Sequence, residues 1–164
     1  MTAPLIRAAV PDDAGAISAV RLASWRAAYG PLLPTGTLDD VAGVAWAARL
    51  RDRLANGQAI MLVAEDAGTV QAFSWFGPCR DDDLPEADQI YALYADPTQW
   101  SRGLGRALMA ATLPRLRRPV ALWVLEANAR ARRFYEIAGF RADGSVKDAD
   151  LYGATRPEVR YILR

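Results

Sequence analysis

Ala95-Asp-Pro-Thr-Gln-Trp100-Ser-Arg-Gly103-Leu-Gly105-Arg106 joins an apolar, strand-like run to a stretch with helical spacing. Backbone N–H groups at a helix start have no acceptor within the helix, and the helix dipole makes this end positive. Glycines at 103 and 105 let an anion approach the backbone without meeting a Cβ atom. Arg102 and Arg106 add positive charge. The stretch therefore predicts a phosphate-binding turn, although a bare Gly-x-Gly equally fits a strand-to-helix turn that uses glycine only for its geometry.

Two other nucleotide motifs do not fit these letters. The dinucleotide fingerprint requires glycine or alanine three residues after Gly105, where Leu108 stands. The P-loop requires Gly-Lys followed by Ser or Thr, and the sequence contains no such tripeptide. Neither a Rossmann nor a P-loop nucleotide site is therefore expected.

A second strand followed by a helix is predicted for Trp123-Val-Leu-Glu-Ala-Asn128-Ala-Arg-Ala131-Arg-Arg-Phe-Tyr135-Glu-Ile-Ala-Gly139-Phe140. Asn128 suits the N-cap, and Tyr135 lies two helical turns later on the same face as Asn128 and the small Ala131. Gly139 stands where a glycine ends a helix. Taken singly, these residues are explained by a cap, core packing and a stop. Together with the Gly103 turn, they favour a ligand-binding face.

Apolar periodicity outside these two segments completes a mixed α/β fold with helices on both faces of the sheet. The acidic segment Asp81–Asp83 is expected in a solvated loop. Helices are predicted at 14–29, 38–54, 103–113 and 128–138, and strands at 5–9, 58–65, 70–76, 89–95, 120–125, 140–146 and 158–163.

Composition narrows the possible functions. The 164 residues, 52% of them hydrophobic, suit one domain spanning 1–164. A net charge of +1 predicts no nucleic-acid or membrane partner. Absence of histidine and the single Cys79 exclude His-dependent nucleophilic triads and cysteine-rich metal sites, and no metal is expected. No apolar run has the length of a signal peptide or membrane span, which predicts a cytoplasmic protein.

The two segments together resemble the Gcn5-related N-acetyltransferase (GNAT) superfamily, and the resemblance extends over nearly the whole chain. Trp100–Gly105 is similar to the family's Gln/Arg-x-x-Gly-x-Gly/Ala turn. Asn128 to Phe140 matches its Asn-x-x-Ala-x-x-x-Tyr-x-x-x-Gly-Phe signature. There are two departures: Trp100 replaces the usual Gln or Arg, and Gln89 stands where the family often has a glutamate base.

The resemblance implies a GNAT-like fold, with a partly splayed mixed sheet, and transfer of acetyl from acetyl-CoA to a primary amine of a small molecule or amino acid. A protein or peptide acceptor is the alternative within the same chemistry. A non-catalytic module that binds acyl-CoA is a further alternative, motivated by Gln89. The resemblance leaves open whether the chain is a monomer or a homodimer.

The resemblance also assigns residues to roles. Tyr135 would protonate the departing thiolate. Without histidine, the expected base is Glu126, with Glu86, Asp88 or a water held by Tyr91 or Gln89 as alternatives. An acceptor pocket is predicted from Trp25, Tyr29, Trp75, Tyr91 and Tyr152. Core packing is the commoner role of aromatic residues at such spacings, except for Trp25 and Tyr29, which the family's helices place near the acceptor. Cofactor contacts are expected from Leu93, Tyr94, Ala95, Ser101, Arg102, Gly103, Leu104, Gly105, Arg106, Asn128, Ala131 and Arg133.

Overall fold

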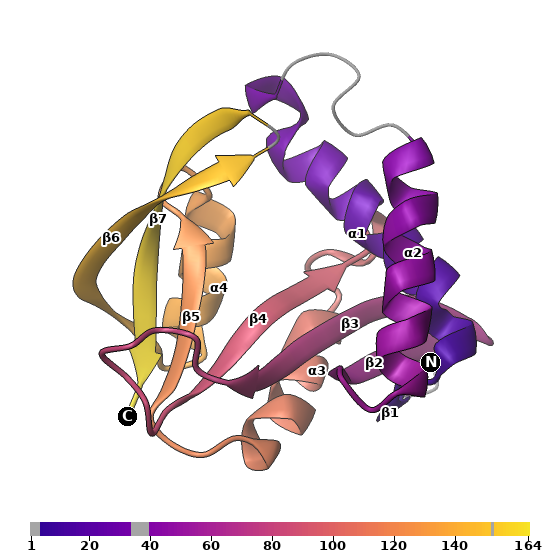
Figure 1. The fold of residues 1–164 in the computed structure, drawn as a ribbon, viewed down its shortest axis with the longest axis horizontal. Helices are drawn as coiled ribbons and strands as arrows, with labels where there is room; N and C mark the ends of the chain where they lie inside the picture. The colour runs from indigo at the N-terminus through magenta and orange to yellow at the C-terminus, as the bar shows by residue number, and fades with distance from the viewer. Residues whose placement is uncertain (1–3, 34–39, 152) are drawn as a thin grey trace. The chain divides into compact units, whose positions relative to one another are not determined.

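A computed structural model describes residues 4–33, 40–151 and 153–164 (Figure 1). Its elements alternate in the order that the sequence predicts. The helices are α1 (Ala14–Tyr29), α2 (Asp40–Ala55), α3 (Leu104–Thr112) and α4 (Ala129–Ile137), and the strands are β1 (Leu5–Ala8), β2 (Ile60–Asp66), β3 (Thr69–Pro78), β4 (Asp88–Ala95), β5 (Val120–Leu125), β6 (Arg141–Leu151) and β7 (Ala154–Leu163).

The strands form one seven-stranded mixed sheet in the order β1-β2-β3-β4-β5-β7-β6, which confirms the predicted α/β class. β4 pairs with β5 in parallel over Asp88–Ile90, whereas the β1–β2, β2–β3, β5–β7 and β6–β7 pairs are antiparallel. Contacts divide the chain into two compact units, one of residues 1–76 and 92–114 and the other of 77–91 and 115–164.

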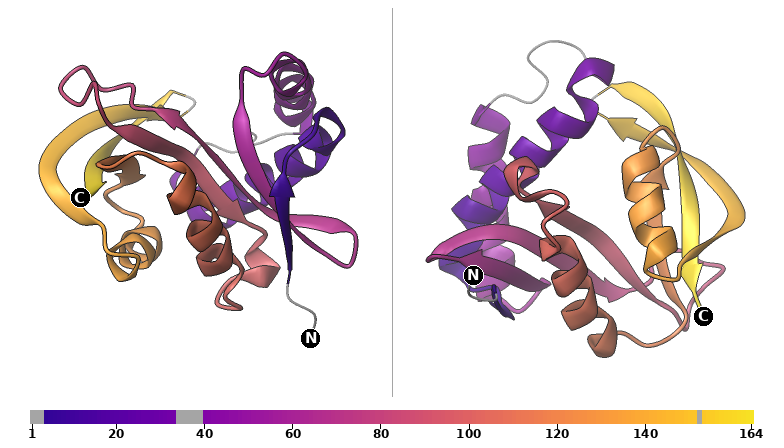
Figure 2. Two further views of the ribbon diagram at one scale, coloured as in Figure 1. Left: turned by 90° about the horizontal axis from the view of Figure 1, so that it is seen from below. Right: turned by 180° about the vertical axis from the view of Figure 1, so that it is seen from behind.

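In the first unit, α1 and α2 pack on one face of the β2–β3 hairpin. Ile17, Leu50, Val63 and Phe73 are almost fully buried in this layer. α3 covers the opposite face (Figure 2). The hairpin turn lies where Asp66–Thr69 predicts it, with positive φ angles at its two central residues.

In the second unit, β5 is buried on both faces, as its unbroken apolar run predicts. α4 lies against the β5–β7 face that carries Tyr161, because Arg132 Nε donates to the Tyr161 hydroxyl at 3.1 Å. The predicted extents of the last two strands are wrong. β6 continues to Leu151 and β7 begins at Ala154. Most of β6 is solvent-exposed, so no apolar alternation marks its second half.

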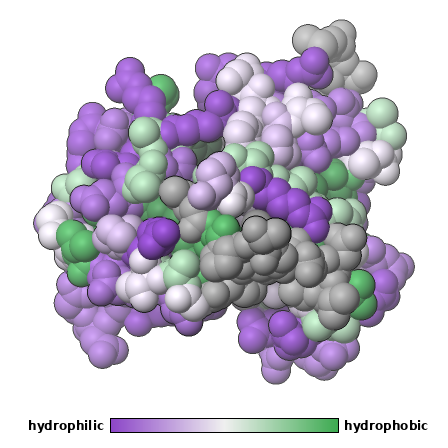
Figure 3. Space-filling view, turned by 90° about the horizontal axis from the view of Figure 1, so that it is seen from above, coloured by the Kyte–Doolittle hydropathy of each residue, from purple (hydrophilic) through white to green (hydrophobic). Residues whose placement is uncertain are grey.

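None of the described helices is long and apolar enough to cross a membrane. On the face drawn in Figure 3, hydrophobic residues form small areas separated by hydrophilic ones. Large apolar side chains that remain exposed come from different elements: Leu5, Val10, Val44, Ile60, Ile137 and Val146.

Candidate functional site

The predicted phosphate-binding turn connects β4 to α3 in the first unit. A short 3-10 helix spans Pro97–Gln99, and the Asp96 carboxylate accepts from the Thr98 backbone N–H at 2.9 Å. Ser101 and Gly103 then adopt left-handed conformations, with φ of +64° and +86°. Gly103 is the N-cap of α3. Left-handed residues just before a helix turn successive N–H groups toward a common concavity, the usual geometry of an anion nest.

Gly103 also leaves room for an anion. Within the described part of the chain, a Cβ atom built on this glycine would have one neighbour within 4 Å, Arg106 Nη2 at 3.8 Å. A small negatively charged group beside Gly103 would therefore meet backbone amides and a guanidinium. The residues of the turn fit a pyrophosphate.

Trp100, the departure from the family motif, closes the turn. Its indole Nε1 donates to the Ala95 carbonyl at 3.0 Å, which links the end of β4 to the segment before α3. The Asp96 N–H donates to the Gln71 carbonyl of β3 at 2.8 Å. The indole thus holds the turn in shape, so the substitution does not disrupt it.

Aromatic side chains from α1 and β4 come together in the same unit. The Trp25 ring lies edge-on to Tyr29 and Tyr94, at centroid distances of 5.3 and 6.5 Å. Trp75 instead lies beside Arg53, 5.7 Å from its ring. Tyr152 lies outside the described residues. The structure therefore brings together Trp25 and Tyr29 of the predicted acceptor residues, with Tyr94 as a third member.

The second unit holds the signature that begins at Asn128. The Asn128 Oδ1 accepts from the Ala131 N–H at 3.0 Å, so its predicted capping role is confirmed. Tyr135 is buried between Phe134 and Phe140. Gly139, at φ +98°, ends the helix as predicted.

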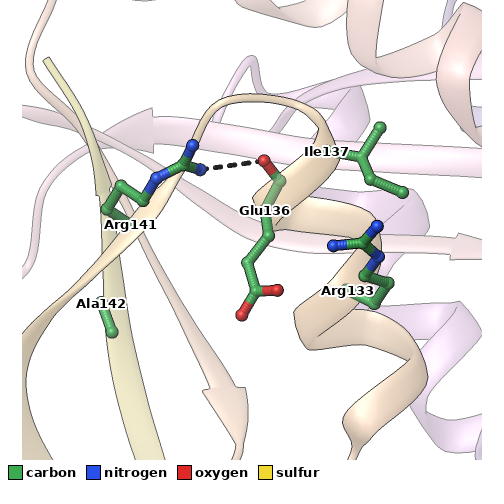
Figure 4. Close-up of a pocket in the computed structure, with 5 residues that line it drawn as sticks. All are labelled: Arg133, Glu136, Ile137, Arg141 and Ala142. Atoms are coloured by element: carbon green, nitrogen blue, oxygen red, sulfur yellow. Dashed lines mark hydrogen bonds between the residues drawn. The ribbon is translucent and has the colours of Figure 1, made fainter.

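Arg133 lines a shallow pocket at the end of α4 together with Glu136, Ile137, Arg141 and Ala142 (Figure 4). The Arg141 guanidinium donates to the Glu136 carbonyl at 3.0 Å, which connects β6 to the helix. The neighbouring Arg132 is engaged with Tyr161 and the Glu126 carbonyl. Of these two arginines, Arg133 lines this open pocket.

The carboxylates considered as bases occupy different surroundings. Glu126 and Glu86 are exposed. Asp88 is buried and accepts from both the backbone N–H and the guanidinium of Arg117, at 2.7 and 3.1 Å, so it holds the segment before β5 in place.

The residues proposed to hold a water both bond to the loop between β3 and β4. Gln89 Oε1 accepts from the Arg80 N–H at 3.0 Å, and the Tyr91 hydroxyl donates to the Pro78 carbonyl. The Arg80 guanidinium lies 3.7 Å from the centre of the Tyr91 ring. The Gln89 departure therefore has a structural explanation, since its side chain anchors this loop.

Sequence reasoning missed the ion-pair network that fixes the same loop. Arg160 of β7, 5% exposed, donates to Asp81, Asp83 and Asp143 at 3.2, 2.7 and 2.8 Å. Asp81 also accepts from Trp123 Nε1 at 2.9 Å. The expectation of a solvated Asp81–Asp83 loop is thus wrong for Asp81, whose side chain is 15% exposed, whereas Asp83 pairs with Arg160 and stays solvent-exposed. The available signal was one arginine within the otherwise apolar run from 159 to 163.

The network changes the pKa values of its members. Its aspartates hold the pKa of the Arg160 guanidinium above the ordinary value, Asp83 most strongly. The hydrogen bond from Arg160 lowers the pKa of Asp83. Burial opposes ionisation of Asp143, but hydrogen bonds from Ser145 and Arg160 outweigh it, so the pKa of Asp143 is also lowered.

Comparison with known proteins agrees with this geometry. The Acetyltransferase (GNAT) family profile matches residues 22–140. A probable N-acetyltransferase of Mycobacterium tuberculosis is 32% identical over 162 residues, covering 96% of this chain and 92% of that protein. A mycothiol acetyltransferase of Propionibacterium freudenreichii is 36% identical over 103 residues, covering 59% of this chain and 31% of that protein.

Solved structures share the fold. The PaiA N-acetyltransferase of Thermoplasma acidophilum, in complex with coenzyme A, superposes with a TM-score of 0.74 at 17% identity, covering 96% of this chain and 98% of that one. The yncA protein of Salmonella typhimurium, whose structure includes acetyl-CoA, gives a TM-score of 0.69 at 21% identity, covering 99% and 94%. The family match and the full-length relative together assign the chain: it belongs to the GNAT family of acetyltransferases and is an N-acetyltransferase.

Proposed function

We propose that the protein transfers acetyl from acetyl-CoA to a primary amine of a small molecule or amino acid. The main support is the turn before α3, where Ser101 and Gly103 have positive φ angles and Arg106 lies beside an open space. Amides from Ser101 to Arg106, with the Arg102 guanidinium, would hold the pyrophosphate of the donor. This donor supplies an activated acetyl thioester.

Further contacts would position the donor. Backbone groups of Leu93–Ala95, which follow the segment of β4 paired with β5, would bind the pantetheine arm as an added strand does. Asn128 would hydrogen-bond the donor through its amide N–H₂, since its Oδ1 already caps α4. Ala131 would leave it room, and Arg133 would meet a phosphate from its open pocket.

Acceptor binding and proton transfer complete the proposal. Trp25 and Tyr29, with Tyr94 beside them, would line the acceptor site. The Tyr135 hydroxyl would donate a proton to the leaving thiolate. A carboxylate near the end of β5 would accept the proton of the amine; the candidates are the exposed Glu126 and Glu158 of β7, which stands opposite Leu125. The protein is proposed to act in the cytoplasm, without a metal or nucleic-acid partner.

Isothermal titration with acetyl-CoA tests the donor site, with Gly105→Glu as the disruptive variant. A carboxylate in the first turn of α3 would repel the pyrophosphate. Gly15→Glu is the matched control, because Gly15 lies in the first turn of α1 and its side has open space. Binding by the wild type and the control, but not by Gly105→Glu, is expected. A wild type that does not bind acetyl-CoA would refute the proposal.

Turnover then identifies the acceptor. Thiol release is followed with free amines, amino acids and short peptides at saturating acetyl-CoA. Faster turnover of free amines is expected, and a preference for peptides would favour the alternative acceptor class.

A further inference from the structure

The two faces of the β5–β7 pair carry different residues. Tyr161 points toward α4, where its hydroxyl donates to Glu136 Oε1 at 2.9 Å. Side chains alternate along a strand, so Glu158 and Arg160 point to the face away from α4. Residues directly opposite in an antiparallel pair share a face, which places Trp123 beside Arg160 there. By the same rule, Lys147 of β6 lies beside Glu158.

Glu158 differs from the other described charged groups on this face in having no contact partner for its charge. Arg160 is compensated by three aspartates, and Lys147 Nζ lies 4.0 Å from the centre of the Trp123 ring. Glu158 is half-buried, yet among the described residues no side chain or backbone group forms a hydrogen bond or ion pair with its carboxylate. A half-buried carboxylate loses part of its hydration and here gains no contact in exchange, so its presence suggests a ligand.

The position of Glu158 suggests which ligand. It stands opposite Leu125, the last residue of β5, and the Glu126 N–H donates to the neighbouring Pro157 carbonyl at 2.9 Å. Asn128, the N-cap of α4, lies three residues after Leu125. Glu158 thus lies at the same end of β5 as the start of the Asn128 signature, whereas the helix that carries Tyr135 covers the other face.

We propose that Glu158 is the catalytic base, which binds the protonated amine of the acceptor and removes a proton from it. The inference rests on the proposed acetyl transfer and specifies its acceptor as an amine that is cationic at neutral pH.

The ammonium gives one proton to the Glu158 carboxylate, and the freed nitrogen lone pair forms a bond to the thioester carbonyl carbon. The C–S bond breaks, and the thiolate takes a proton from Tyr135, which regains one from the nitrogen as the amide forms. Glu158 releases its proton to solvent. In sum, an ammonium and a thioester yield an amide, a thiol and one proton.

Burial raises the pKa of Glu158 above the ordinary glutamate value, and the charge of Lys147 opposes this only in part. A raised pKa makes a carboxylate a stronger base near neutral pH. The charged groups on the face of Glu158 are Lys147 of β6, directly opposite, and Arg156 and Arg160 of β7, two residues to either side. Arg160 brings Asp81, Asp83 and Asp143 to this face.

The test compares Glu158→Gln with Glu126→Gln and with Asp148→Asn. Asp148 is an exposed carboxylate next to Lys147 but on the other face of β6, so it controls for loss of one charge. For each protein, kcat/KM for one amine is measured from pH 5 to 9, and acetyl-CoA affinity is measured by titration. The ratio of wild-type to variant kcat/KM is plotted against pH, because ionisation of the amine cancels in this ratio.

Glu158→Gln is expected to lower kcat about 100-fold or more, the usual contribution of a general base, with unchanged acetyl-CoA affinity. The ratio should fall toward acid pH as Glu158 becomes protonated. Lys147→Met should move this midpoint to higher pH, and Glu158→Asp should restore part of the activity. A melting temperature of Glu158→Gln at or above the wild-type value excludes misfolding as the cause.

A ratio that does not vary with pH, a kcat within a few-fold of wild type, or an equal loss in Glu126→Gln would overturn the assignment while acetyl transfer stands. A wild type that binds no acetyl-CoA or acetylates no amine would overturn the proposed function and this inference with it.

Discussion

Removal of Arg160 should lower the stability of the protein, because its ion pairs connect three segments. The side chain of Arg160 is 6% exposed. Its guanidinium joins β7 to the loop between β3 and β4 and to β6. Arg160→Ala would leave Asp81 and Asp143 partly buried without their partner. Breaking a buried ion pair costs about 3–5 kcal/mol, and we expect a loss of that order in the free energy of unfolding by urea. Arg49→Ala, at an exposed position of α2, should change it by less than about 0.5 kcal/mol.

The pH dependence of stability follows from the same residue. The folded-state pKa values of Asp83 and Asp143 are lowered, so their contribution is complete above the unfolded value near 3.8 and is lost as pH falls through the folded values. We expect the melting temperature of the wild type to fall steeply below about pH 4. Arg160→Ala should show a shallower fall, and equal slopes would contradict the network.

Ionisation of Glu158 affects stability in the opposite direction. Its folded-state pKa is raised, so the carboxylate disfavours folding once pH rises from the unfolded value through the folded one. Glu158→Gln should therefore match the wild-type melting temperature near pH 4 and exceed it at pH 7. Scanning calorimetry at the two pH values measures this, and a variant that is less stable at pH 7 would show that the carboxylate has a stabilising partner.

The sequence predicts contacts between near neighbours in the chain, but not contacts between distant residues. The Asn128 cap and the Gly139 stop depend on neighbours within a few residues, so sequence spacing predicts them. Arg160 depends on Asp81, 79 positions away, and a sequence does not show which distant residues meet. The unpartnered state of Glu158 is invisible for the same reason.

At the start of α3, the effect of a substitution on backbone strain can be measured separately from its effect on acetyl-CoA binding. An alanine at a positive φ costs about 1–2 kcal/mol. Gly103 has φ +86° and Gly57, at the end of α2, has φ +67°; neither would meet a severe clash. We expect Gly103→Ala and Gly57→Ala to lower unfolding free energy alike, whereas only Gly103→Ala weakens acetyl-CoA binding in a titration. Equal affinities would remove this turn from the donor site.

The start of α4 allows a parallel separation. Asn128→Ala removes the cap and should cost about 1 kcal/mol of stability. Asn128→Asp keeps an oxygen that accepts from the Ala131 N–H but loses the amide donor and adds a negative charge. Urea unfolding should therefore find Asn128→Asp as stable as the wild type. Titration should find its acetyl-CoA affinity lowered, and unchanged affinity would leave Asn128 with a capping role alone.

Elements with strong signals were predicted in order and type. Helices with an apolar stripe and the buried β5 follow directly from periodicity. β6 was predicted too short because a largely exposed strand paired along one edge carries no apolar alternation. Asp81 in the loop between β3 and β4 was expected to be solvated because its partners, Trp123 and Arg160, lie far away in the sequence.

For the whole molecule, the family was predictable because two separate motifs had to agree. Neither the Gly103 turn nor the Asn128 helix decides the fold alone, but their spacing and the strands around them occur together in one family. Composition could exclude chemistry, since a chain without histidine requires another base. It could not choose among carboxylates, because that choice depends on burial and on which face of a strand each one occupies.

Donor binding should stabilise the whole protein. A ligand that binds only the folded state at 100 times its Kd adds about 2.7 kcal/mol. For a chain of this size, each kcal/mol raises the melting temperature by about 2–4 °C, so acetyl-CoA should raise it by roughly 5–11 °C. The shift should grow with the logarithm of acetyl-CoA concentration above its Kd. This dependence distinguishes specific binding from a general effect of added salt. Gly15→Glu should keep the shift and Gly105→Glu should lose it. A shift retained in Gly105→Glu would mean that the donor binds away from α3, and the turn would then be a structural feature alone.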